Sequence, residues 1–241
     1  MAQYRCSCKI GKRRAKGSNA ISHYAYISAS IEYDEERNKT WKYTGKNEVI
    51  YTETILPKHI EEIRPQYKDG NILWNDIQKL EKHSRAQLYR EYEINLPIEI
   101  QDIIKAEPDL EKRKQLEQAG NAYYAELAKE YADVFTKQGQ CCSVAVHNKD
   151  GNPHVHIMCT MRAFDKDKKE WLPKQKKIYL NKEGKEAKTK EERVYNKKNR
   201  TYKCKTVKTT DWDEKDKLFQ IRKAVEIIEN KKLKELGFDT R

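Results

Sequence analysis

Two segments in the second half of the chain alternate between apolar and polar residues, which is the pattern of strands that bury one face. They are CCSVAVH at residues 141–147 and HVHIMCTMR at residues 154–162. The connection between them, NKDGNP, contains an Asp-Gly pair that favours the tight turn of a hairpin. The pattern therefore predicts an antiparallel β-hairpin.

Two more alternating segments predict strands in the first half of the chain. QYRCSCKI occupies residues 3–10, and YREYEINLP occupies residues 89–97 and ends at a proline, which cannot donate to a sheet ladder. Residues 38–57 lie between them, have no clear period and are expected to be irregular.

Helical patterns separate these strands. SNAISHYAYISASIEYDEER at residues 18–37 has Ser18 as a good N-cap, and ILWNDIQKLEKHSRAQL at residues 72–88 keeps its leucines near one side. NAYYAELAKEYADVFTKQG at residues 121–139 ends on a glycine, and a last helix covers about residues 212–236. Paired strands interrupted by helices indicate an α+β fold, with a mainly antiparallel central sheet and helices packed on one face.

The composition suits a compact core surrounded by charged elements, since 37% of the 241 residues are hydrophobic and another 37% are charged. The formal net charge of +12 favours a polyanionic partner. Nucleic acid is preferred over membrane, because no stretch approaches the roughly 18 apolar residues of a spanning helix. The first residues contain no apolar run of signal-peptide type, which indicates a cytoplasmic protein. The six cysteines show no paired Cys-x-x-Cys spacing and are expected to be reduced and mostly buried.

Three of the six histidines fall within the predicted hairpin. Residues two apart on a strand share a face, so His154 and His156 point the same way. His147 is opposite in parity to Val144 and Val146, so the hairpin can bring the three imidazoles together on one side. Such a cluster indicates a metal site, either a zinc ion with an open position or a manganese, magnesium or nickel ion. The alternative is a solvated sheet face whose histidines bond to their neighbours.

The same residues resemble a known family. HNKDGNPHVHIMCTMR is similar to the three-histidine motif of the HUH relaxases, specifically the MobA/MobL mobilisation proteins. YRCSCKIGKRRAKGSNAISHYAYISAS and ILWNDIQKLEKHSRAQLYREYEINLP resemble two further segments of that family. The tyrosine precedes the histidines, as in relaxases, whereas rolling-circle replication initiators have the reverse order. The resemblance covers about residues 1–165, taken as the catalytic core, and we expect residues 166–241 to complete the same domain with a basic segment and a C-terminal helix.

The resemblance implies nicking and rejoining of one DNA strand at an origin of transfer through a 5′-phosphotyrosine. It implies Tyr26 as the nucleophile, with Tyr24 as its rival about 200° away on the helix. It also implies Glu91 as a catalytic carboxylate, which orients a ligand histidine or helps to take the phenolic proton, while Glu93 shares its strand face. The implied cofactor is a divalent ion, Mn²⁺ or Mg²⁺, held by the three histidines.

The implied partners are single-stranded or hairpin origin DNA, with accessory mobilisation proteins and a coupling protein, and no membrane insertion. Two other classes stay open. One is a DNA-binding module that recognises the origin without cutting it, and the other is a three-histidine zinc hydrolase, for which the positive charge and the tyrosine helix have no role.

Basic residues concentrate between Lys182 and Lys208, where eleven Lys or Arg occur with four Glu and two tyrosines. Lysines interleaved with aromatic rings suit a surface that tracks phosphates and stacks bases. A solvated charged hairpin is the equal alternative. The DNA-binding candidates in this segment and in GKRRAKG are Lys12, Arg13, Arg14, Lys197, Lys198, Arg200, Tyr202 and Lys203.

Overall fold

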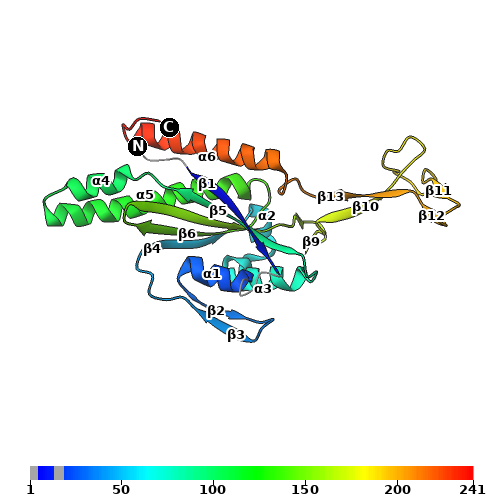
Figure 1. Cartoon of the computed structure of the whole chain (residues 1–241), viewed down its shortest axis with the longest axis horizontal. Helices are drawn as coiled ribbons and strands as arrows, with labels where there is room; N and C mark the ends of the chain where they lie inside the picture. Colours follow the sequence, from blue (N-terminus) through cyan, green and yellow to red (C-terminus); the bar gives the residue numbers. More distant parts are fainter. Residues whose placement is uncertain (1–4, 14–18, 241) are drawn as a thin grey trace. The chain divides into compact units, whose positions relative to one another are not determined.

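A five-stranded antiparallel sheet organises the larger of two compact units in the computed structural model (Figure 1), which describes residues 5–13 and 19–240. The strand order is β1-β5-β7-β6-β4. The strands are β1 (Cys6–Lys12), β5 (Gln87–Asn95), β7 (Asn152–Cys159), β6 (Cys142–Lys149) and β4 (Val49–Ile55). The predicted α+β class with an antiparallel sheet is confirmed, as is the hairpin of β6 and β7.

Three helices cover one face of this sheet (Figure 1): α4 (Glu99–Ala106), α5 (Leu110–Thr136) and α6 (Lys215–Glu235). The core beneath them contains Val144 and Ile157 from the strands and Phe135 from α5, whose ring lies 4.6 Å from that of Tyr92. The alternating residues of β6 and β7 thus bury their apolar side here, which turns their polar side to the other face. No helix within the described residues is both long and apolar enough to span a membrane.

Helices also lie on the opposite face, so helical cover is not restricted to one side as the sequence suggested. They are α1 (Ala20–Ser28), α2 (Lys58–Ile63), the 3-10 helix η1 (Pro65–Lys68) and α3 (Gly70–Leu80). From α3, Trp74 donates through Nε1 to the Ser143 hydroxyl of β6 at 2.8 Å. The polar face of the sheet is therefore partly covered by short helices that carry their own polar groups.

The predicted helix over residues 18–37 is wrong beyond its first half. Asn19 caps α1, whereas the predicted cap Ser18 lies outside the described residues, and the helix ends before Ala29, which has a left-handed conformation with φ of 53°. The chain then forms a hairpin of β2 (Ile31–Asp34) and β3 (Lys39–Lys42). Asp34 is fully buried and accepts hydrogen bonds from Trp41 and from Gln78 of α3, so tertiary contacts select the hairpin here.

Two other sequence expectations also need correction. Residues 38–57 are not irregular, because they contain β3 and the edge strand β4, which pairs with β6. The helix expected over residues 72–88 ends at Leu80, and Gln87 already begins β5. An edge strand has only one neighbour and buries few of its residues, and so β4 has little of the alternation that identifies a strand.

Residues 162–214 form the second compact unit, while residues 215–241 belong with the sheet. Its main ladder pairs β10 (Gln175–Tyr179) with β13 (Cys204–Lys208), and its short strands are β8 (Phe164–Asp165), β9 (Glu170–Trp171), β11 (Tyr195–Asn196) and β12 (Thr201–Tyr202). The ring of Tyr202 lies 5.3 Å from that of Tyr195 and 6.1 Å from that of Tyr179, and Arg193 stacks on Tyr179 at 4.1 Å. The predicted domain boundary at residue 165 stays a prediction.

All six cysteines are free thiols, and most are buried, as expected.

Candidate active site

Three imidazoles meet on the polar face of the hairpin. His147 of β6 lies opposite His154 of β7, and His156 follows two residues later. Their ring centroids are separated by 4.6 to 5.1 Å. One nitrogen from each ring lies within 4.8 Å of the others, so the group could hold one metal ion.

One nitrogen of each ring has an oxygen partner that fixes the ring's orientation. His154 Nδ1 lies 2.8 Å from the Asn152 carbonyl oxygen, and His156 Nδ1 lies 2.6 Å from Glu91 Oε1. His147 Nε2 lies 2.7 Å from the Ile27 carbonyl oxygen. When these nitrogens donate, each ring is a neutral tautomer with one lone pair left to bind a cation.

The surroundings favour the neutral form of two of these rings, His147 and His154. Burial, with a smaller effect of the neighbouring imidazoles, lowers the pKa of His147 to about 4. Burial also lowers the pKa of His154. A protonated imidazole has no lone pair to offer, so neutral rings are the form that can bind a divalent ion.

Glu91 lies beneath the cluster and joins two histidines. Its side chain is buried, with one oxygen on His156 Nδ1 and the other 3.0 Å from His23 Nε2 of α1. Burial raises the pKa of Glu91, but the hydrogen bonds from His156 and His23 outweigh it and bring that pKa well below the usual range. Glu91 therefore stays charged and orients the His156 ring.

Helix α1 is attached to the cluster at both ends. Near its start, His23 reaches Glu91 and stacks on Tyr89 of β5 at 4.8 Å. Near its end, the Ile27 carbonyl oxygen accepts from His147. Tyr26 therefore lies on a helix that is held against the histidine site.

The two candidate tyrosines have different environments. Tyr26 is 45% exposed. Tyr24 packs against the first residue of α3, where a Cβ added to Gly70 would be 2.3 Å from its ring. Burial raises the pKa of Tyr24 to about 12. A half-buried phenol that packs against α3 and resists ionisation is a poor nucleophile, so this geometry favours the exposed Tyr26.

The chain also matches a known protein family. A family model described as MobA/MobL matches residues 18–109 and 114–241, which is most of the chain. The chain belongs to the MobA/MobL family.

Individual relatives support the same assignment. A probable mobilization protein MobA of Bifidobacterium longum is 25% identical over 220 residues, which are 88% of this chain and 35% of that protein. A probable conjugal transfer protein TraA of Sinorhizobium fredii is 27% identical over 165 residues, which are 64% of this chain and 13% of that protein. This MobA/MobL chain thus aligns with only a minor part of the length of these relatives.

A solved structure reported as "Molecular Basis of Vancomycin Resistance Transfer in Staphylococcus aureus" is 26% identical to this chain, with a TM-score of 0.69. The match covers 100% of this chain and 97% of that one. The fold is therefore shared over the whole chain.

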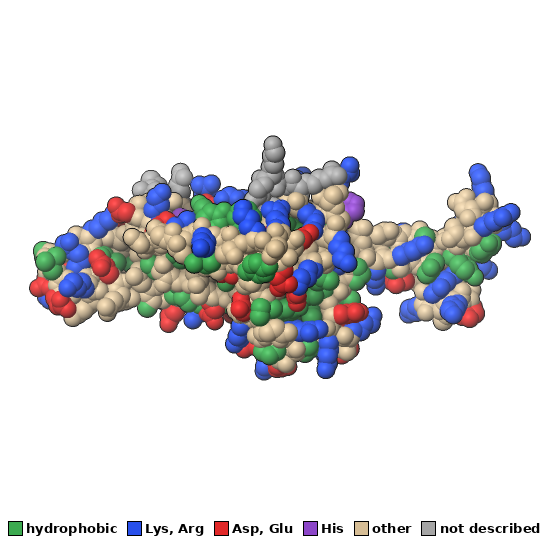
Figure 2. Space-filling view, turned by 90° about the horizontal axis from the view of Figure 1, so that it is seen from below, with side chains coloured by type: hydrophobic (Ala, Val, Ile, Leu, Met, Phe, Trp, Pro, Cys, Tyr) green, Lys and Arg blue, Asp and Glu red, His purple; other side chains and the backbone are tan. Residues whose placement is uncertain are grey.

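The residues that the sequence suggested for DNA binding by this MobA/MobL chain lie at two places in the structure. Lys12 is exposed at the end of β1, but Arg13 donates to the Gln78 carbonyl oxygen at 3.0 Å and pairs with Glu36. Arg14 lies outside the described residues. In the second unit, where Figure 2 shows many basic side chains, the five other candidates are exposed. They are Lys197, Lys198, Arg200, Tyr202 and Lys203.

Sequence reasoning missed three residues near this site. His23 reaches Glu91, Lys46 contacts Tyr26, and Lys9 of β1 pairs with Glu93 at 2.5 Å beside the cluster. The sequence alone gave no signal for Lys9, because its place beside the site follows only from the pairing register of β1 with β5, in which Lys9 lies opposite Glu91. His23 gave a weak signal, since it lies one helical turn before the predicted nucleophile.

Proposed function

We propose that this chain nicks and rejoins one DNA strand at an origin of transfer, with Tyr26 joined to the 5′ phosphate during the reaction. The observation that carries the proposal is the contact of His147 Nε2 with the Ile27 carbonyl oxygen at 2.7 Å. It holds the helix of an exposed tyrosine against a cluster of three imidazoles. A nucleophile beside a cation site is what cleavage of a charged phosphodiester requires.

His147, His154 and His156 would hold the divalent ion, for which we propose Mn²⁺ or Mg²⁺. The donor set fits, because the three rings each bring one nitrogen within 4.8 Å of the others and each ring is oriented by one oxygen partner. Once bound there, the ion would neutralise charge on the nonbridging phosphate oxygens. Neutral ligands suit this role because they leave the charge of the ion for the phosphate.

In the proposed reaction, the Tyr26 hydroxyl gives up its proton to solvent, and its oxygen attacks phosphorus and forms a phosphotyrosine bond. The bond from phosphorus to the 3′ oxygen breaks, and that oxygen takes up a proton to leave as a 3′ hydroxyl. Rejoining reverses the step, since the hydroxyl attacks the phosphotyrosine and releases Tyr26. Glu91 acts through His156, whose ring it orients, as a positioning residue.

The proposed substrate is single-stranded or hairpin DNA of the origin. Exposed lysines around Tyr195 and Tyr202 support binding by residues 182–208, because phosphates attract lysine and bases stack on exposed rings. Accessory mobilisation proteins and a coupling protein are the further partners that this function requires.

A labelled-strand assay tests the function. The protein is incubated with Mn²⁺ and labelled single strands that span the mobilisation region of its genetic element, and a denaturing gel then separates covalent adducts. The proposal expects an adduct on one of the two strands. A protein that binds these strands but forms no adduct on either would instead be a non-cleaving origin-binding module.

A further inference from the structure

Lys46 lies against the tyrosine that we propose as the nucleophile. Its Nζ donates to the Tyr26 carbonyl oxygen at 2.9 Å and lies 3.1 Å from the centroid of the Tyr26 ring. An ammonium over an aromatic face is attracted by the electrons of the ring. Tyr43 meets the same ring edge-on at 5.5 Å. The two side chains together set the orientation of the Tyr26 ring.

The charge of Lys46 is not neutralised by an acidic partner. Across residues 5–13 and 19–240, no carboxylate oxygen lies within 4.0 Å of its Nζ, whereas Lys9 has Glu93 at 2.5 Å. An ammonium has three N–H donors. The Tyr26 carbonyl takes one and the ring face another, so one donor and a full positive charge are left for a ligand.

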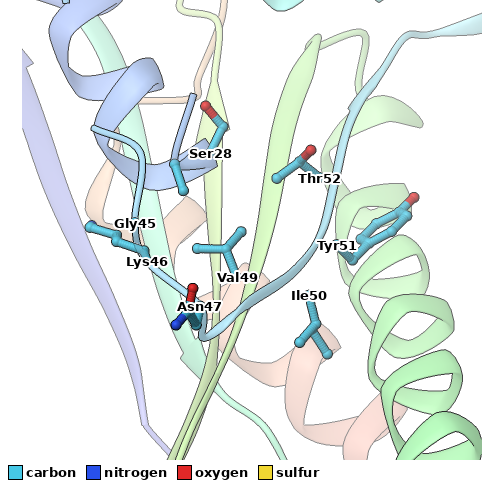
Figure 3. Close-up of a pocket in the computed structure, with 9 residues that line it drawn as sticks. Ser28, Gly45, Lys46, Asn47, Val49, Ile50, Tyr51 and Thr52 are labelled. Atoms are coloured by element: carbon cyan, nitrogen blue, oxygen red, sulfur yellow. The ribbon is translucent and has the colours of Figure 1, made fainter. Parts of the chain in front are cut away.

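A polar groove begins beside Lys46. Its volume is about 310 Å³, near the lower end of the roughly 300–1,000 Å³ of small-ligand sites. Figure 3 shows Ser28 at the end of α1 on one side and the segment from Gly45 to Thr52 around the rest. Ser28, Asn47 and Thr52 give the groove two hydroxyls and an amide.

The groove continues directly from the proposed reaction centre. Lys46 contacts Tyr26 through its Nζ and also lines the groove. A DNA strand whose phosphate reaches Tyr26 would therefore have its next nucleotide beside Lys46.

We propose that Lys46 and this groove form a subsite for the unpaired nucleotide next to the scissile phosphate. The ammonium contacts a DNA phosphate and at the same time holds the Tyr26 ring in place, which makes Lys46 a positioning residue. The subsite rests on the proposed function, because it takes Tyr26 as the attacking group.

Salt dependence of DNA binding tests the subsite without cleavage. The probe is a fluorescein-labelled single strand of thymidine nucleotides, and anisotropy gives its binding constant over a series of NaCl concentrations. In Lys46→Met, the slope of log K against log salt should become shallower by about 0.7, the value for one phosphate contact on a single strand. Lys46→Arg keeps the charge and should keep the slope.

Lys114→Met is the matched control, because Lys114 is an exposed lysine on α5, which covers the opposite face of the sheet. Its slope should equal that of the unaltered protein. A salt slope of Lys46→Met that equals the slope of the unaltered protein would overturn the subsite. Circular dichroism checks that the variants are folded.

Acetylation of lysines in the unaltered protein gives a second measurement that needs no variant. Single-stranded DNA should protect Lys46 but not Lys114, and equal modification of Lys46 with and without DNA would reject the contact.

These outcomes are distinguishable from failure of the proposed function. A shallower Lys46→Met slope in a protein that never forms a covalent adduct would keep the subsite and reject nicking. An adduct together with an unchanged slope would keep nicking and reject the subsite.

Discussion

At the scale of single residues, the site depends on groups that contact each other across long stretches of sequence. His23 meets Glu91 and Ile27 meets His147, and neither contact follows from local spacing. The face shared by His154 and His156 was predictable because strand parity is a local property. His23 and Lys46 were not, since their roles depend on where helix α1 packs.

Glu91→Gln gives the first test at this scale. Removing the charge that orients His156 should weaken Mn²⁺ binding by roughly 10- to 100-fold, as removal of such outer partners does. Isothermal titration measures the affinity. Glu93→Gln is the control, because Glu93 shares the strand face but pairs with Lys9, and it should cause a smaller loss. Equal Mn²⁺ affinity in Glu91→Gln and the unaltered protein would refute the orienting role.

At the scale of elements, the sequence predicted the β6–β7 hairpin well because its turn and its alternation are both local. It missed β4, an edge strand with weak alternation, and it extended α1 too far. The end of α1 is set by the hairpin that follows, in which the buried Asp34 binds Asn19 and Gln78. Contacts of this kind outweigh local helical preference and leave no periodic signal.

The contact between α1 and α3 predicts the effect of a single methyl group. Gly70→Ala places a Cβ at 2.3 Å from the Tyr24 ring, so the ring or one of the two helices must shift. We expect a loss of about 1–3 kcal/mol in the free energy of unfolding, measured by urea denaturation. In a Tyr24→Ala background the same change should cost much less. An equal cost in both backgrounds would show that the ring is not the obstacle.

The histidine hairpin predicts how cleavage and binding respond to chelation. Excess chelator should abolish adduct formation, because the phosphate then lacks the charge that neutralises it. DNA binding should survive, since the exposed lysines are unaffected. The two are measured in parallel by denaturing gel and anisotropy. Undiminished cleavage in excess chelator would remove the metal from the mechanism.

At the scale of the whole molecule, the net charge of +12 drew attention to residues 182–208, whose role in DNA binding stays a prediction. Composition alone could not show that residues 162–214 form a compact unit separate from the sheet, because that division depends on contacts. The rings of Tyr195 and Tyr202 in this unit meet edge-on and are partly exposed. Such a surface is suited to bases as well as phosphates.

Deletion of residues 186–208 tests the contribution of this unit. DNA binding should weaken, and the salt slope should fall by roughly 0.7 for each phosphate of the single strand that the shortened protein no longer neutralises. Cleavage should persist at saturating DNA, because the deleted segment contains neither Tyr26 nor a ligand histidine. An unchanged salt slope would mean that the segment is only a solvated loop.

The central claim is that Tyr26 forms the covalent bond to DNA. The most direct measurement digests the adduct and identifies the modified peptide by mass spectrometry, with Tyr26→Phe and Tyr24→Phe as paired variants. We predict a 5′ phosphate on Tyr26, no adduct but normal DNA binding in Tyr26→Phe, and most of the activity in Tyr24→Phe, because each change removes one oxygen and keeps the ring. DNA on Tyr24, or on a histidine or serine, would contradict the account.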